Sequence, residues 1–401
     1  MSHIAIIGAG QAGASLASKL RGLGHEGPIT LIGEEPAPPY QRPPLSKKYL
    51  LGEMPLERMY LKPEAAYGEA GIELCLGGKV EAVDTQTKTL TMGEKTLSYD
   101  QLAFTTGSTV RHLADDQGGA LGNVFTVRTL ADVDAMAVAF ARGGHVLIIG
   151  GGYIGLEAAA VAAMKGLKVT LIEAADRILK RVAAPETADY FRALHEGHGV
   201  EIREGVGLTR LTGDTVVTGA ELSDGTTLSI DFAIVGVGID PATALAAAAG
   251  LDIENGIKTD AQGRTSAPDV WAAGDCASFP YRGDRIRLES VPNAIDQAEV
   301  VAANMLGAGQ DYVAKPWFWS DQYDVKLQIA GLNTGYDRVV VRDTGRAQSN
   351  WYFRGEELLA VDAMNDARGY MIGKRLIEAG KSPAPEALAD PETDLKALLK
   401  A

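Results

Sequence analysis

Two stretches of the chain share one pattern of apolar and polar positions: a short apolar run, a glycine-rich turn, a helix-like segment and a second apolar run. The first stretch covers residues 4–35 and the second covers residues 145–173. An apolar run that leads directly into glycines is typical of a buried parallel strand, and a helical segment then returns the chain to the next strand. Each stretch therefore predicts a βαβ unit, and the pair predicts two doubly wound α/β domains.

The pattern changes twice more along the chain. Alternating runs up to about residue 231 predict further strands, and the runs at 234–241 and 270–275 predict a return to the first domain. After residue 316 an aromatic cluster leads into strand-like runs at 326–330, 338–341 and 351–354, which predict an antiparallel sheet closed by helices. The last thirty or so residues predict helical turns and a frayed tail.

These boundaries predict three domains in an α/β protein. Residues 1–110 and 235–315 form the first Rossmann-like dinucleotide-binding domain, residues 111–234 the second, and residues 316–401 a C-terminal α+β domain with an antiparallel sheet. A length of 401 residues is consistent with two or three domains.

Composition narrows the class of protein. A formal charge of −14 argues against a nucleic-acid partner bound through its phosphates. The longest apolar stretch, residues 154–164, is too short for a membrane span and contains Glu157, so no membrane association is expected. The first strand starts near residue 4 and leaves no room for a signal peptide, which predicts a cytoplasmic location. Cys75 and Cys276 lie far apart, so we expect neither a redox dithiol nor a metal site.

The first glycine-rich turn is a dinucleotide-binding fingerprint. Gly8, Gly10 and Gly13 follow the apolar run, which would let the backbone approach a pyrophosphate at a helix N-terminus. Glu34 lies 21 positions after Gly13, near the offset at which an acid binds a ribose hydroxyl, and Glu35 is a near-equal candidate. The alternative for the glycines is a tight structural turn without a ligand.

The second turn has the same spacing. Its glycines and the apolar residue before the last of them are Gly150, Gly152, Ile154 and Gly155. Glu173, 18 positions beyond the last glycine, would accept a hydrogen bond from a ribose 2′-hydroxyl and repel a 2′-phosphate, which favours NADH over NADPH. Arg177 and Arg181 leave the alternative open, because an arginine near the ribose can accommodate that phosphate.

Two nucleotide sites in one chain point to a bound flavin that receives hydride from a diffusing nicotinamide. Five further motifs lie outside the fingerprints: Tyr40-Gln41-Arg42-Pro43-Pro44-Leu45-Ser46-Lys47, Thr105-Thr106-Gly107, Ala273-Gly274-Asp275, Glu289-Ser290-Val291-Pro292-Asn293-Ala294 and Pro316-Trp317-Phe318-Trp319-Ser320-Asp321-Gln322. With the fingerprints, they resemble the NADH-dependent ferredoxin reductases of oxygenase systems, in matching order over essentially the whole chain. The resemblance implies hydride transfer from NADH to FAD, then single-electron transfer to a 2Fe-2S ferredoxin that serves a cytochrome P450 or a Rieske-type oxygenase.

The resemblance also implies binding residues. Positions that match the family's FAD contacts, beside the first fingerprint, are Ala12, Glu34, Arg42, Lys47, Val80, Thr106, Gly107, Arg128, Asp275 and Val291. Asp275 would hold the ribityl chain, and its alternative role is a helix N-cap. On the NADH side the resemblance adds Ile154, Glu173 and Arg181 to the second fingerprint.

Three residues are expected to act at the flavin ring. By the resemblance, Lys47 and Glu157 form a pair beside the isoalloxazine, where the lysine stabilises negative charge and the glutamate offsets the cation. The alternatives are a solvated lysine and an acid favoured by the helix dipole. Trp319 matches a tryptophan on the side where ferredoxin approaches, and an ordinary core tryptophan is its alternative.

The expected macromolecular partner is the ferredoxin, with the protein itself a monomer or a weak homodimer. Because such ferredoxins are acidic, docking would need basic residues on the C-terminal domain, where the candidates are Arg338, Arg342, Arg346, Lys374 and Arg375. A peroxidase or disulfide reductase of this fold would need a cysteine in the loop that holds Leu45, Ser46 and Lys47. The remaining alternative is a slow flavoprotein of the apoptosis-inducing type, in which the reduced, NAD-bound form acts as a signal.

Overall fold

The computed structural model describes residues 2–400, and the chain folds into two compact units. The first unit contains Met1–Arg42, Pro55–Thr109 and Ile239–Pro316. The second contains Pro43–Met54, Val110–Gly238 and Trp317–Ala401. The short segment that carries Lys47 therefore packs with the second unit, although its neighbours on both sides belong to the first.

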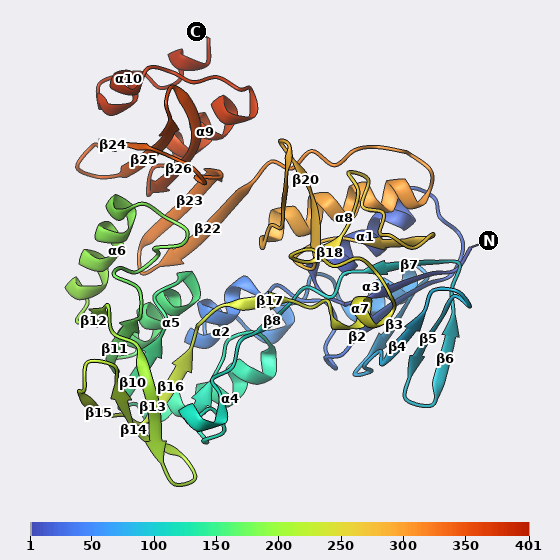
Figure 1. Ribbon diagram of the computed structural model, residues 1–401, viewed down its shortest axis with the longest axis horizontal. Helices are drawn as coiled ribbons and strands as arrows, with labels where there is room; N and C mark the ends of the chain where they lie inside the picture. The colour runs from blue at the N-terminus through green and yellow to red at the C-terminus, as the bar shows by residue number, and fades with distance from the viewer. Residues whose placement is uncertain (1, 401) are drawn as a thin grey trace. The chain divides into compact units, whose positions relative to one another are not determined.

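The first unit is built on a parallel five-stranded sheet with the order β19-β7-β1-β2-β3. Its strands are β1 (Ile4–Ile7), β2 (Ile29–Gly33), β3 (Ile72–Leu76), β7 (Gln101–Phe104) and β19 (Val270–Ala272). The apolar side chains of β1 are fully buried, as expected for a parallel strand covered on both faces. Helices α1 (Gln11–Gly22) and α8 (Val291–Met305) lie side by side and share one core cluster with the sheet (Figure 1).

Smaller elements complete this unit. An antiparallel sheet with the order β4-β5-β6 follows β3, and a second small sheet has the order β18-β20-β21. The bounds are α3 (Glu64–Glu69), β4 (Ala82–Asp84), β5 (Thr89–Met92), β6 (Lys95–Ser98), α7 (Ala244–Ala248), β18 (Ile257–Lys258), β20 (Ala277–Tyr281) and β21 (Asp284–Ile286).

The second unit contains its own parallel five-stranded sheet, with the order β12-β11-β10-β16-β9. Its strands are β9 (Val124–Phe125), β10 (His145–Ile149), β11 (Lys168–Glu173), β12 (Glu201–Glu204) and β16 (Phe232–Val235). Helices α4 (Leu130–Arg142), α5 (Tyr153–Met164) and α6 (Pro185–Gly197) connect them, and a three-stranded sheet of β13 (Leu208–Gly213), β14 (Val217–Leu222) and β15 (Thr227–Ser229) is attached. The short helix α2 (Lys48–Leu51) packs near α4.

The same unit includes the predicted antiparallel sheet, whose order is β22-β23-β26-β25-β24. Its strands are β22 (Trp317–Gln322), β23 (Val325–Gly331), β24 (Arg338–Asp343), β25 (Gln348–Arg354) and β26 (Glu357–Met364). Helix α9 (Ala367–Glu378) covers one face (Figure 1), and Gly373 lets it approach Trp351 and Val361 closely. The predicted fold class, with two Rossmann-like folds and an antiparallel C-terminal sheet, is confirmed.

The expectation of a frayed tail is wrong for the residues that the structure describes. After α10 (Pro385–Ala389) the chain is held by Arg342, whose guanidinium donates hydrogen bonds to the carbonyl oxygens of Leu388, Asp390, Pro391 and Thr393. Leu395 is buried in the C-terminal core. No periodic pattern signals this segment, because one arginine from a distant strand orders it.

Buried polar groups join α6 to the antiparallel sheet. Thr187 donates a hydrogen bond of 2.8 Å to Asp362 on β26, and the Tyr352 hydroxyl donates to the same carboxylate oxygen. Asn350 reaches Thr187 at 2.8 Å. Burial raises the pKa of Asp362 to about 6, and the two hydroxyl donors partly offset that rise.

Candidate active site

The first fingerprint adopts the geometry that a bound pyrophosphate requires. Gly8 has φ of +114°, and a Cβ there would lie 2.2 Å from the carbonyl oxygen of Thr105. A Cβ on Gly13 would lie 2.0 Å from the carbonyl oxygen of Gly8. Gly10, at the N-cap of α1, faces open space, with nothing within 4 Å of a Cβ. Two glycines thus allow close packing, and the third keeps the helix N-terminus clear for a ligand.

The second fingerprint repeats this arrangement. Gly150 has φ of +109° and packs against the carbonyl of Gly236, while Gly155 packs against the carbonyl of Gly150. Gly152, the N-cap of α5, again has nothing within 4 Å of a Cβ. Both turns therefore fit a dinucleotide phosphate, which supports one nucleotide in each unit.

The structure separates the two acids at the end of β2. Glu35 is turned inward, where it accepts a hydrogen bond of 2.6 Å from Tyr40 and forms an ion pair of 2.6 Å with Arg42. Glu34 is 71% exposed, and its carboxylate lies 3.7 Å from the Lys79 ammonium. The Glu35 carboxylate is therefore already engaged within the protein, whereas the Glu34 carboxylate is exposed just after the end of β2.

At the matching position of the second fold, Glu173 ends β11. Its carboxylate accepts hydrogen bonds of 2.8 Å from the backbone N–H groups of Gly151 and Ala175, which hold it beside the glycine turn. Arg177 is directed elsewhere, because its guanidinium donates to the carbonyl of Ala183 at 2.8 Å. Arg181 is exposed.

Lys47 and Glu157 form the predicted pair. Lys47 Nζ lies 2.9 Å from Glu157 Oε1, and the two side chains are only 14% and 5% exposed. Two serine hydroxyls donate to the same carboxylate: Ser46 Oγ to Oε2 at 2.6 Å and Ser320 Oγ to Oε1 at 2.6 Å. The ammonium and both hydroxyls act as donors here, so each oxygen of the Glu157 carboxylate accepts at least one hydrogen bond or ion-pair contact. Residue types alone did not indicate the two serines, although both stand inside motifs noted in the sequence.

Ser320 and Trp319 are neighbours on β22, so their side chains point to opposite faces of the strand. The Trp319 ring is half-buried, with its centroid 5.5 Å from that of Trp317. On α5, the ring of Tyr153 packs against Phe318, with centroids 5.1 Å apart. The C-terminal sheet thus contributes directly to the surroundings of Glu157.

The remaining predicted residues occupy both units. In the first unit, Ala12 and Val80 are buried, and Val291 begins α8. Thr106 donates a hydrogen bond of 2.7 Å to the carbonyl of Ala242, and the next residue, Gly107, has φ of +68°. Asp275 follows Gly274 and precedes β20, so it does not cap a helix; Ser290 caps α8 instead. In the second unit, Arg128 precedes the N-cap of α4, and Ile154 is 43% exposed at the start of α5.

The structure leaves fewer basic residues of the C-terminal domain free to contact a ferredoxin than the sequence suggested. Arg342 is buried and engaged with the tail, so it cannot contact a partner. Lys374 is paired with Glu378, whereas Arg375 and Arg346 are both exposed on the C-terminal domain. The prediction for Arg342 is wrong because its guanidinium satisfies carbonyl groups that the sequence does not reveal.

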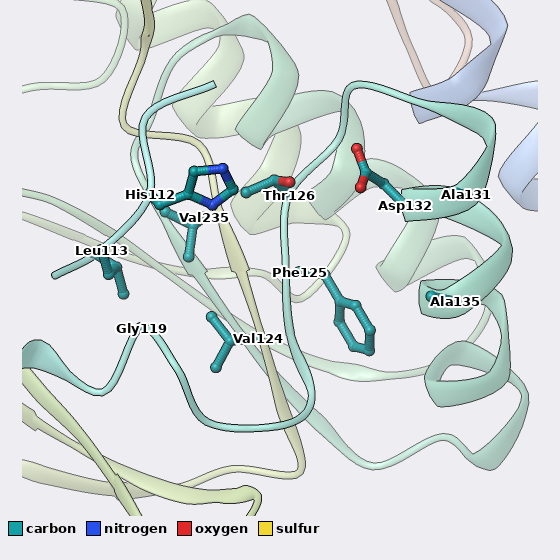
Figure 2. A pocket seen from close by; sticks show the side chains of 10 residues that line it. All are labelled: His112, Leu113, Gly119, Val124, Phe125, Thr126, Ala131, Asp132, Ala135 and Val235. Carbon is teal, nitrogen blue, oxygen red and sulfur yellow. The ribbon is translucent and has the colours of Figure 1, made fainter. Parts of the chain in front are cut away.

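A pocket of about 280 Å³ lies in the second unit, beside the first turn of α4 (Figure 2). Val124, Phe125 and Val235 form its apolar part, and His112, Thr126 and Asp132 its polar part. The Asp132 carboxylate is already engaged by the backbone N–H groups of Arg128 and Thr129. None of the predicted site residues lines it, and it is smaller than most ligand pockets.

A fold with two dinucleotide-binding sheets, glycine turns open to phosphate and a buried Lys–Glu pair defines an FAD-dependent pyridine-nucleotide oxidoreductase. The model of the pyridine nucleotide-disulphide oxidoreductase family matches residues 2–298, and that of the reductase C-terminal domain matches residues 317–399. The chain belongs to this family, among the putidaredoxin reductase-like ferredoxin reductases.

Similar proteins cover the whole chain. A ferredoxin–NAD(P)⁺ reductase from a Sphingomonas species is 44% identical over 98% of this chain and 96% of its own length. Putidaredoxin reductase from Pseudomonas putida is 38% identical over 100% of this chain and 97% of its own. The crystal structure of the covalent putidaredoxin reductase–putidaredoxin complex superimposes with a TM-score of 0.95 at 37% identity, covering 100% of this chain and 98% of that one. The predicted family and its cofactors, FAD and NADH, are confirmed. No helix within residues 2–400 is long and apolar enough to cross a membrane.

Proposed function

We propose that this protein is a cytoplasmic NADH-dependent ferredoxin reductase that uses FAD to supply single electrons to a 2Fe-2S ferredoxin of an oxygenase system. The observation that carries the proposal is the buried Lys47–Glu157 pair in the unit that holds the second fingerprint. Bound FAD would supply the chemistry that accepts a hydride from NADH and releases its electrons one at a time.

The chain's own residues would bind and position the reactants. The open N-termini of α1 and α5, at Gly10 and Gly152, would each hold a pyrophosphate, with Glu34 and Glu173 at the respective riboses. Glu157 would hold the Lys47 ammonium in a place with little water, where a fixed positive charge stabilises negative charge strongly. Positioning is then the main catalytic contribution of the protein.

Thiol chemistry finds no support in the structure. Ser46, in the loop where a cysteine enzyme of this fold would carry its thiol, donates its hydroxyl to Glu157. Of the two cysteines, Cys276 is buried and Cys75 is half-buried, and burial raises the pKa of both thiols. A peroxidase or disulfide reductase would instead need a reactive thiolate.

The test is cytochrome c reduction by NADH with and without candidate 2Fe-2S ferredoxins, with NADPH in parallel. We expect the rate to depend strongly on ferredoxin. Slow turnover with every ferredoxin, together with a long-lived charge-transfer absorbance after NADH addition, would favour the signalling alternative.

A second measurement addresses the ferredoxin side. Trp319→Ala should slow ferredoxin reduction more than ferricyanide reduction, because the small acceptor does not need a shaped docking face. Equal slowing of both reactions would remove Trp319 from that role.

A further inference from the structure

A continuous line of hydrogen bonds leads from Glu157 through the C-terminal sheet to α6. Ser320 Oγ contacts Glu157 at 2.6 Å, Gln322 Nε2 contacts Ser320 Oγ at 3.2 Å, and His195 Nε2 contacts Gln322 Oε1 at 2.8 Å. The line ends where the Tyr323 hydroxyl lies 3.2 Å from His195 Nδ1. Ser320, Gln322 and His195 are all fully buried.

The groups in this line can donate and accept in only one consistent order, so all of its hydrogen bonds have the same direction. A carboxylate only accepts, so Ser320 donates to Glu157 and accepts from the Gln322 amide. The Gln322 carbonyl oxygen then accepts from an N–H at His195 Nε2. Burial lowers the pKa of His195 to about 4, so the ring is neutral near pH 7, and Nδ1 accepts from the Tyr323 hydroxyl.

Every hydrogen bond in the line therefore points toward Glu157. Aligned hydrogen bonds polarise one another in a site of low dielectric, which strengthens the last bond, onto the carboxylate. Because Ser320 and Lys47 share Oε1 while Ser46 takes Oε2, the Glu157 carboxylate cannot rotate without breaking a contact.

We propose that Ser320, Gln322 and His195 are positioning residues that hold Glu157, and through it Lys47, in the geometry used for hydride transfer from NADH. This inference rests on the proposed function. It follows that the C-terminal sheet takes part in flavin reduction by NADH as well as in electron transfer to the ferredoxin.

The test compares single variants of the flavin-loaded protein by stopped-flow reduction with NADH. Ser320→Ala should lower the limiting rate of flavin reduction about tenfold, the scale of one hydrogen bond to a charged group. The apparent Kd for NADH should stay within about twofold, since other residues hold the nucleotide. Ser320→Thr, which keeps the hydroxyl, should restore most of the rate.

The matched control is Ser278→Ala. Ser278 is also fully buried on a strand, but its hydroxyl finds no hydrogen-bond partner among the described residues. Its flavin content and reduction rate should equal those of the wild type. If Ser320→Ala matches this control, the inference is overturned, whereas a wild type that NADH cannot reduce would overturn the proposed function.

A second readout needs no variant and no turnover. In the ¹⁵N-histidine-labelled, flavin-loaded protein, the NMR signals of His195 should show a ring protonated at Nε2 and bare at Nδ1, unchanged between about pH 5.5 and 8. A ring protonated at Nδ1 would reverse the direction of these hydrogen bonds and contradict the inference, even if Ser320→Ala proved too unstable to purify.

Discussion

A Cβ on Gly13 would lie 2.0 Å from the carbonyl oxygen of Gly8, whereas a Cβ on Gly10, three residues earlier, would meet nothing within 4 Å. The two glycines of one fingerprint therefore serve different purposes. Gly13 lets the helix pack against the turn, and Gly10 leaves room for a ligand.

The corresponding variants should separate folding from binding. Gly13→Ala should impair folding of the protein even without cofactor, because backbone atoms would have to move. Gly10→Ala should leave the apoprotein's unfolding transition nearly unchanged but abolish the yellow FAD absorbance of the purified protein. Urea unfolding and flavin content measure the two effects, and FAD retention by Gly10→Ala would contradict this account.

Glu157→Gln should weaken both the site and the fold. The amide keeps the shape of the side chain but leaves the Lys47 ammonium, 14% exposed, without its counter-charge. We expect about 10²-fold slower flavin reduction by NADH and a loss of about 3 kcal/mol in unfolding free energy. The control is Glu221→Gln, which removes the exposed pair with Arg210 and should leave the urea unfolding midpoint nearly unchanged.

The two arginines near Glu173 should differ in their effect on coenzyme choice. Arg177 is held by backbone carbonyls, so Arg177→Ala should lower stability without changing the ratio of NADPH to NADH activity. Arg181 is exposed, so Arg181→Ala should lower kcat/KM for NADPH by about fivefold and leave the NADH value within twofold. The reverse assignment, with Arg177 controlling NADPH use, would show that the loop rearranges on binding.

Asp362 should impose a distinctive pH dependence on stability. Its pKa is about 6 in the fold against an ordinary value of 3.8 for an aspartate, so the folded state binds more protons between these two pH values. Its contribution to stability is therefore fully present below about pH 4 and is lost as the pH rises through 6. His195, with its pKa lowered to about 4, acts in the opposite sense over the same window, so the two contributions partly cancel.

The Asp362→Asn variant loses the contribution of Asp362 to the pH dependence and keeps that of His195. As the pH rises from 4 to 6.5, the unfolding free energy of the variant should rise relative to that of the wild type, by up to about 3 kcal/mol. Urea unfolding of both proteins at several pH values measures the difference. A pH-independent difference would show that the Asp362 carboxyl does not titrate in this range.

The amino-acid sequence by itself determined the fold class and both glycine fingerprints, whereas the Lys47–Glu157 pair was implied by the resemblance to the ferredoxin reductases. Glycine spacing and runs of buried apolar residues are local properties, so they can be read without knowing what lies nearby in space.

Only the tertiary structure showed that Glu35 is engaged by Arg42 while Glu34 is exposed, and that Arg177 and Arg342 bind backbone carbonyls. It also placed Ser46 and Ser320 on Glu157, with Gln322 and His195 behind Ser320. Each of these depends on hydrogen-bond partners that are far away along the chain or that compete for the same group. Such partners leave no periodic signal in the sequence, because a buried polar side chain is satisfied by whichever group the packing brings within about 3 Å.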